Sequence, residues 1–307
     1  MTGFVPLERG EEATADLWYA SVTGSFRSKG FGARADVRGA SGGFRPYYGT
    51  DVWLQEGYAF APTPAGELSV GKSERAFGLP DETFSGTLFS ANGVTRNPIW
   101  GGALSGEARV GYDSLTWAVR WEGLSDKAGP WEEEGRGAAS DPGTKLRDGV
   151  SARLTYLFYK GLVTLRPGLS ASSVRVAHDD GRPGFRLNDA ALDVTLTAGP
   201  IALLGQFFVR GGERQMPGAA ETRLAYDDAT AGLVGLRAEF PTVAFRYYWT
   251  QWSYRGADAT EWLHQPAVVW TPVKGIEATI EYLARRLTGP GGRRSGDAFR
   301  LGLALRF

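Results

Sequence analysis

Apolar and polar residues alternate along most of the chain, in segments of roughly ten residues, the length of a strand that crosses a membrane. Val150 and Leu154, for example, share one face of an extended chain, and Arg153 lies on the other. The alternation recurs in residues 31–38, 104–112, 115–122, 190–196, 201–210, 234–240 and 276–282. It predicts β-strands that each have one apolar and one polar face.

The segments that connect these strands are of two alternating kinds. Tight turns are expected at 112–115, 159–162, 198–201, 240–242 and 272–275. Longer, polar, Gly/Pro-rich loops are expected near 75–97, 126–147, 177–187, 212–228, 254–261 and 288–297. Short turns on one side and long loops on the other are typical of a transmembrane antiparallel β-barrel, with short periplasmic turns and long external loops. We therefore expect an all-β chain in which residues 1–307 form a single barrel domain.

The number of strands depends on the N-terminus. Fifteen strands can be drawn from about residue 16 onward, and single-chain bacterial barrels have even numbers of strands. Residues 3–10 would supply a sixteenth, although Pro6 argues mildly against a strand there. Sixteen strands are favoured over fourteen, because sixteen make residues 75–97 the third external loop.

The last strand ends the chain on an aromatic residue. Phe299, Leu301, Leu303, Leu305 and Phe307 alternate with polar or small residues. This pattern resembles the C-terminal signature of bacterial outer-membrane barrels, in which the assembly machinery reads the last strand. The resemblance implies that Leu303, Leu305 and Phe307 form an assembly signal and that the protein lies in the outer membrane. The first twelve residues lack the cationic start and apolar core of a signal peptide, so either the protein is not exported or Met1 replaces a removed leader. The pattern of membrane strands favours the second expectation.

Composition narrows the choice of fold further. The chain contains ten Trp, twelve Tyr and sixteen Phe, which fit aromatic girdles at the two membrane interfaces of a barrel. A soluble barrel or propeller with aromatic-rich strands is the alternative explanation of this composition. No stretch approaches the ~18 uncharged apolar residues of a membrane helix. The formal net charge is zero, which gives no field to attract nucleic acid. The chain has no cysteine and therefore no disulfide or thiolate chemistry.

Arginine dominates the polar faces of the strands, since only six of the 34 cations are lysine. A charged side chain that faces lipid costs about 2–4 kcal/mol at mid-bilayer, so these residues must face the lumen. Their surplus over carboxylates predicts a mild preference for anions, while the simpler interpretation is that Arg–carboxylate pairs brace the wall. The predicted lining residues are Arg34, Arg38, Arg109, Arg120, Arg153, Arg166, Arg210, Arg237, Arg246, Arg285, Arg300, Glu107, Glu122, Glu277 and Glu281.

The loop at 75–97 is long and rich in Phe, Gly and Thr, and we expect it to fold into the lumen and constrict it. Its candidate constriction residues are Asp81, Glu82, Phe84 and Arg96. Asp81 and Glu82 would then face wall arginines across the narrowest point.

Catalytic chemistry has little support. The two histidines, His178 in a polar segment and His264 near a strand start, have no obvious orienting partner, and no Gly-x-Ser-x-Gly elbow occurs. No histidine cluster for a metal and no phosphate-binding glycine loop is apparent. We expect no enzyme activity, no cofactor and no metal.

A more specific resemblance lies in YGTDVWLQEGYAFAPTPAGELSVGKSERAFGLP and in the closing QPAVVWTPVKGIEATIEYLARR. These stretches are similar to the phosphate-selective porins O and P, over about a third of the chain. The resemblance implies a trimeric, water-filled pore that tolerates anions. Phosphate selectivity in that family is associated with lumenal lysines, and only Lys72 matches the motif here, so we do not carry it over.

The sequence therefore predicts an outer-membrane porin for passive diffusion of small hydrophilic or anionic solutes, surrounded by lipid and lipopolysaccharide. The main alternative is a closed barrel that serves as a scaffold in an envelope complex, and an outer-membrane hydrolase is a weaker one.

Overall fold

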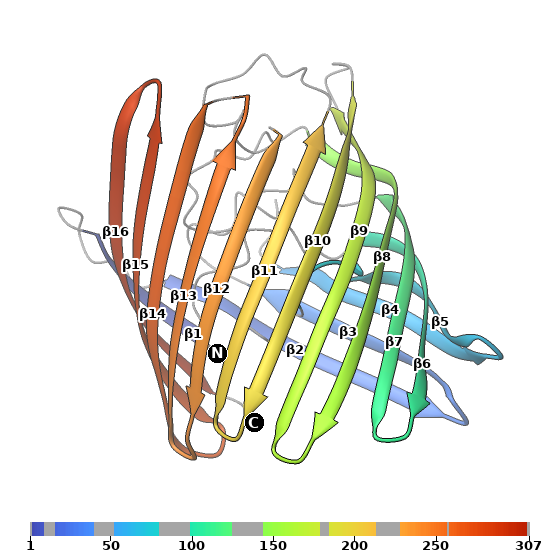
Figure 1. The fold of residues 1–307 in the computed structure, drawn as a ribbon. Coiled ribbons are helices and arrows are strands. Elements are labelled where there is room, and N and C mark those ends of the chain that lie inside the picture. The colour runs from blue at the N-terminus through green and yellow to red at the C-terminus, as the bar shows by residue number, and fades with distance from the viewer. Residues whose placement is uncertain are drawn as a thin grey trace.

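The structure is a computed structural model that describes residues 2–8, 16–39, 52–79, 99–124, 144–178, 184–212, 228–256 and 258–305. Within these residues the chain forms sixteen strands in one antiparallel sheet, in which each strand pairs with its neighbours in sequence. The first strand also pairs with the last, so the sheet closes into a barrel (Figure 1). The predicted fold class is confirmed, with sixteen strands rather than fourteen.

The strands are β1 (Thr2–Glu8), β2 (Asp16–Ser28), β3 (Phe31–Gly39), β4 (Val52–Thr63), β5 (Gly66–Ser73), β6 (Ile99–Val110), β7 (Asp113–Leu124), β8 (Thr144–Lys160), β9 (Val163–His178), β10 (Phe185–Ala198), β11 (Ile201–Gly212), β12 (Ala229–Glu239), β13 (Val243–Tyr254), β14 (Ala259–Val273), β15 (Ile276–Gly289) and β16 (Gly292–Leu305).

The N-terminal strand β1 closes the barrel mainly through the C-terminal strand. It pairs with β16 along its whole length, from Thr2 opposite Ala304 to Glu8 opposite Ala298. Its pairing with β2 involves only Thr2, Gly3 and Phe4. Pro6 lies beyond that short ladder, where the strand has one paired side, so the missing N–H of proline breaks no bond with β2.

Short turns gather at one end of the barrel, which we call the short-turn end (the lower end in Figure 1). Gly30, Gly111, Gly161, Gly199 and Gly275 supply the positive φ that these turns require. The longer connections lie at the opposite, long-loop end.

Two of the predicted long loops are shorter than expected. Residues 288–297 belong mostly to β15 and β16, which continue to Gly289 and Gly292 and leave a turn of residues 290–291. Likewise, β13 and β14 cover both ends of the predicted loop 254–261. The strand ends at 288–297 are polar on both faces and carry no apolar alternation, so polarity gave the wrong boundary there. At 254–261 the strands extend into the predicted loop through the buried residues Tyr254 and Ala259.

The outer face of the barrel is apolar. Val22, Phe26, Leu192 and Ile280 are all exposed, and each alternates with residues that point inward. Large exposed apolar side chains recur on the strands from β2 to β16. A closed sheet with a continuous apolar exterior satisfies its backbone internally and places its apolar surface in hydrocarbon, which is the arrangement of a transmembrane barrel. In the parts of the chain that the structure describes, no helix is long and apolar enough to span a membrane.

Gly71, in the Val-Gly-Lys stretch of β5, occupies a position that only glycine can take. Its φ of +138° is one that L side chains rarely adopt, and a Cβ there would lie 2.3 Å from the carbonyl oxygen of Gly57. The Gly71 carbonyl also accepts a hydrogen bond from Nη2 of Arg120, at 3.3 Å. The close approach of β4 to β5 therefore depends on this glycine.

We predict that Gly71→Ala destabilises the barrel, because the substitution adds about 1–3 kcal/mol of backbone strain as well as the clash. Heat-modifiable mobility on gel electrophoresis would show a lower folded fraction after refolding in detergent. The control is Gly24→Ala, since a Cβ at Gly24 meets nothing within 4 Å. Equal folded fractions for the two variants would contradict this role of Gly71.

Candidate functional site

The inner wall of the barrel carries charged side chains that are mostly paired. Each pair joins an arginine to a carboxylate, on one strand or between strands. The pairs are Arg27–Glu67 at 3.1 Å, Arg34–Glu56 at 3.6 Å, Arg38–Asp36 at 2.8 Å, Arg109–Glu107 at 3.2 Å, Arg153–Asp193 at 2.7 Å, Arg210–Asp189 at 2.8 Å, Arg246–Glu239 at 3.3 Å, and the close contacts Arg237–Glu239 and Arg285–Glu261. The pairs neutralise much of the arginine surplus along the wall.

The segment that follows β5 turns into the barrel and crosses its inner wall. The Arg75 guanidinium contacts the Glu122 carboxylate on β7 at 2.9 Å. Further along, the backbone N–H groups of Ala76 and Gly78 donate to Ser151 Oγ on β8 and Ser170 Oγ on β9, at 3.3 and 3.1 Å. The Leu79 N–H donates to Gln206 Oε1 on β11, at 3.0 Å. Residues 75–79, the wall-crossing segment, therefore span several strands through polar groups that the wall presents inward.

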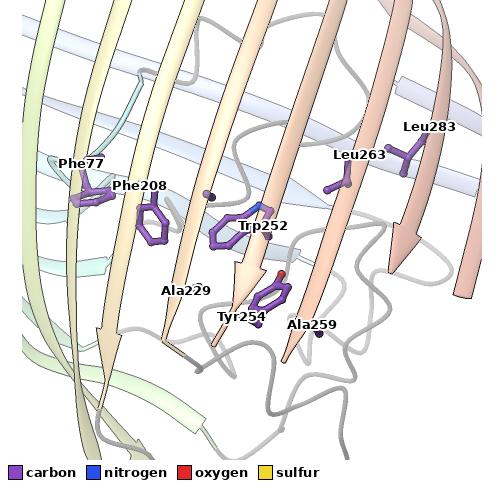
Figure 2. Packing of buried hydrophobic residues seen from close by; sticks show 10 residues of the cluster. Phe77, Phe208, Ala229, Trp252, Tyr254, Ala259, Leu263 and Leu283 are labelled. Atoms are coloured by element: carbon purple, nitrogen blue, oxygen red, sulfur yellow. The ribbon is translucent and has the colours of Figure 1, made fainter. Parts of the chain in front are cut away.

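Apolar side chains hold the same segment in place. Phe77 is fully buried and meets Phe208 of β11 edge to face, with ring centroids 6.0 Å apart (Figure 2). The Phe208 ring lies 5.2 Å from that of Trp252 on β13. Leu79 packs in a second cluster with Leu204, Leu233 and Tyr248. The inner wall is thus apolar over part of β11–β13, which differs from the expectation of uniformly polar inner faces.

Small residues make room for these rings. Ala191, Ala229, Ala231 and Ala259 are buried members of the Phe77 cluster, on β10, β12 and β14. A third cluster at the long-loop ends of β9 and β10 contains Val174, Val176, Phe185 and Leu187, with Ile99 of β6. The expected alternation of apolar outside and polar inside therefore fails in this part of the wall. Phe77 lies in the loop that we expected to enter the lumen, but alternation within the strands gave no sign of its partners.

The exposure of the inner charges differs from one part of the barrel to another. Arg27 on β2 and Arg109 on β6 have side chains that are 67% and 79% exposed. In contrast, the side chains of Arg210 on β11 and Asp189 on β10 are 2% and 1% exposed. Arg27 and Arg109 lie close to the short-turn ends of β2 and β6, as does the exposed Glu239 at the end of β12. The enclosed pair lies in the long-loop halves of β10 and β11, so the inner charges meet water mainly near the short turns.

Some predicted lining residues point inward but are buried. Arg120 is 1% exposed, and its guanidinium donates to Ser73 Oγ at 2.6 Å and to the carbonyl oxygens of Gly71 and Ile99. Glu122 accepts from Arg75, and Glu281 accepts from Gln265 Nε2 at 2.5 Å. These groups hold strands and the wall-crossing segment together, a role that differs from the predicted contact with lumenal water. The sequence alone could not show that backbone carbonyls lie within reach of the Arg120 guanidinium.

Other predicted residues are placed as follows. Arg166 and Glu277 lie on the inner face, and Arg300 is opposite Glu281 in the register of β15 and β16. Leu303 is exposed on the outer face and Leu305 ends β16. The Arg300 and Leu305 side chains, all of Phe307, and the predicted constriction residues Asp81, Glu82, Phe84 and Arg96 lie outside what the structure describes.

The two histidines lie on strands β14 and β9. His264 Nδ1 lies 2.8 Å from Tyr247 Oη, and both residues alternate with inward-facing neighbours, so the pair is on the outer face. His178 is the last residue of β9, opposite Thr144. No group of three or more His, Asp or Glu in the described ranges is arranged to hold a metal ion.

Comparison with known proteins extends the description of the fold. No family model and no curated protein matches the sequence. Among solved structures, an anion-selective porin from Comamonas acidovorans is 11% identical, with a TM-score of 0.65 over 100% of this chain and 98% of that one. OmpF of Salmonella typhi, in complex with daunomycin, is 13% identical, with a TM-score of 0.70 over 100% and 95%. OmpT of Vibrio cholerae in its trimer form is 12% identical, with a TM-score of 0.58 over 100% and 96%. The chain therefore has the porin fold, a sixteen-stranded transmembrane barrel.

We predict that Arg75→Met lowers the free energy of unfolding by about 3–5 kcal/mol, because it leaves the buried Glu122 carboxylate without its nearest guanidinium. Urea titration of the refolded barrel, followed by tryptophan fluorescence, measures this change. The double variant Arg75→Met/Glu122→Gln has no carboxylate at position 122 and should recover part of the loss. A double variant no more stable than the single one would contradict the explanation by charge.

Proposed function

We propose that the protein is an outer-membrane porin through which small hydrophilic solutes diffuse passively, with a mild preference for anions. The support is the closed barrel, its apolar exterior and the charged groups on its inner wall. The similar structures named above include a porin described as anion-selective. A wall of paired charges is hydrated and suits polar solutes. The charges that have no partner decide whether the pore prefers anions or cations.

One observation carries the proposal, namely the uneven exposure of the inner charges. Exposed ionic groups place water at the short-turn ends of β2 and β6, while Phe77, Phe208 and Trp252 occupy the lumen beside β11–β13. We infer that the water-filled route is eccentric and passes on the side of the barrel away from the Phe77 cluster. The wall-crossing segment 75–79 bounds this route, as expected of a constriction loop, and Asp81 and Glu82 would continue it.

The proposed binding partners follow from the same features of the barrel. The exterior contacts outer-membrane lipid and lipopolysaccharide, and a homotrimer is proposed, as in the trimer form described for the similar OmpT. One of the two stretches that resemble the phosphate-selective porins contains Lys72, the one lysine that matches the motif. Lys72 is 1% exposed and its Nζ donates to the Leu54 carbonyl, so this lysine does not offer a charge to a passing phosphate.

The apolar filling around Phe77 also favours a second candidate. Bulky side chains inside a barrel are what a closed scaffold protein would have. The two functions differ in a single property, whether ions pass through the refolded barrel.

We predict discrete open steps when the refolded protein is inserted into a planar lipid bilayer. Under a KCl gradient the reversal potential should shift toward that of chloride. A barrel that folds and inserts but conducts no ions would contradict the porin proposal and favour the scaffold function.

The eccentric route can be tested with single cysteines, since the chain has none of its own. Thr116 on β7 is exposed and Thr250 on β13 is 2% exposed, and both face inward. A cationic methanethiosulfonate reagent should react with Thr116→Cys and lower the single-channel conductance. The matched variant Thr250→Cys should not react, and its conductance should not change. Reaction at both positions would show that water surrounds the whole inner wall.

A further inference from the structure

A recess of about 660 Å³ lies in the inner wall near the short-turn end, over β5–β9. Its volume is in the range of sites for small ligands, roughly 300–1,000 Å³. Apolar residues such as Trp117 and Leu157 contribute to its lining, together with hydroxyl and charged groups that include Ser105, Thr116, Thr155, Arg153 and Arg166. It lies on the side of the barrel where ionic groups are exposed, so solute that follows the proposed route passes it.

The charges in the recess are unequally matched. Arg153 makes a bidentate pair with Asp193, at 2.7 and 2.8 Å, and also donates to Ser170 Oγ at 2.9 Å. Glu107 is paired with Arg109 at 3.2 Å. The other lining carboxylate, that of Glu67, is paired with Arg27 at 3.1 Å. Arg166 has no ion pair or hydrogen bond with any residue in the described part of the chain. The recess therefore keeps one uncompensated positive charge, on Arg166.

The sequence of β9 explains why Asp193, which lies opposite Gly168 on the neighbouring strand β10, does not neutralise Arg166. The next inward position after Arg166 is Gly168, and a Cβ there would lie 2.6 Å from both Arg153 Nη2 and Asp193 Oδ1. The Arg153–Asp193 pair thus packs directly over the bare backbone of Gly168. Since both Asp193 oxygens accept from Arg153, this carboxylate is already engaged by another guanidinium.

We propose that this recess binds small hydroxylated monocarboxylates, the chemical class of sugar acids, as they pass through the pore. The proposal rests on the porin function. A guanidinium binds a carboxylate through two parallel N–H groups, which fixes both position and orientation. The hydroxyls of Ser105, Thr116 and Thr155 both donate and accept, so they match the hydroxyl groups of such a ligand. A single unpaired cation suits a monoanion, whereas a dianionic phosphate requires more than one.

The consequence is a saturable step within an otherwise diffusive pore. Solutes that have both a carboxylate and hydroxyls dwell in the recess, and their dwell time appears as an interruption of the ion current. Solutes that have only one of the two features pass without dwelling.

The test measures block of the single-channel current by gluconate, added on the side of the short turns. Glucose supplies hydroxyls without the charge, and hexanoate supplies the charge without hydroxyls. Gluconate should block at lower concentration than either. Arg166→Gln should weaken this block by about tenfold to a hundredfold, the loss expected for a hydrogen-bonded charged contact. Arg255→Gln, which changes the same charge at an exposed position at the long-loop end, should leave the block unchanged.

Each contrary result has a separate meaning. Equal block in Arg166→Gln and Arg255→Gln would overturn the site, and equal block by hexanoate or glucose would overturn the ligand class. A barrel that conducts nothing would instead contradict the porin function. Calorimetric titration of gluconate into the refolded protein tests the recess independently of conductance. Heat of binding that is lost in Arg166→Gln supports the site, and its absence in the unmodified chain overturns it.

Discussion

Hydrocarbon offers no hydrogen-bond partner to a peptide group, so a sheet that crosses a membrane has to pair every one of its edges. In this chain the requirement is met where β1 lies against β16, from residues 2 to 8 and 298 to 304. Once the sheet is closed, each strand has an inside and an outside, and alternation assigns every side chain to one of them. The apolar exterior, the charged interior and the two kinds of connection all follow from closure.

The interior then has a problem of its own, because a barrel of this size encloses more space than its side chains fill. The chain solves it unevenly. Beside β11–β13 it places aromatic rings, alanines and part of the wall-crossing segment, and at the short-turn ends of β2 and β6 it leaves ionic groups in water. Buried arginines such as Arg120 and Arg75 bind backbone carbonyls and a carboxylate on β5–β7. Exposed arginines such as Arg109 contact water instead. Similar residues on similar strands thus have different tasks.

Much of the fold could be predicted from the sequence because alternation is imposed by the two solvents on either side of the wall. The outward-facing residues, the number of strands and even β1 with its Pro6 could be predicted for this reason. The inner contacts were less so, since they depend on which distant strands face one another across the lumen. Phe77 meets Phe208 only after closure, and the carbonyls that bind Arg120 become available only where Gly71 permits a close approach. Likewise, the strand ends at 288–297 were predicted to be a loop because they have no apolar face.

The unequal ladders of β1 also order the events of folding. Its three pairs with β2 are too few to hold it early, and its seven pairs with β16 involve residues from the opposite end of the chain. Contacts between such distant positions form slowly, because the whole intervening chain must first be arranged. The seam is therefore expected to be the last part of the barrel to form, and until then two strand edges stand open. A chaperone that covers those edges would protect the protein at its most vulnerable stage.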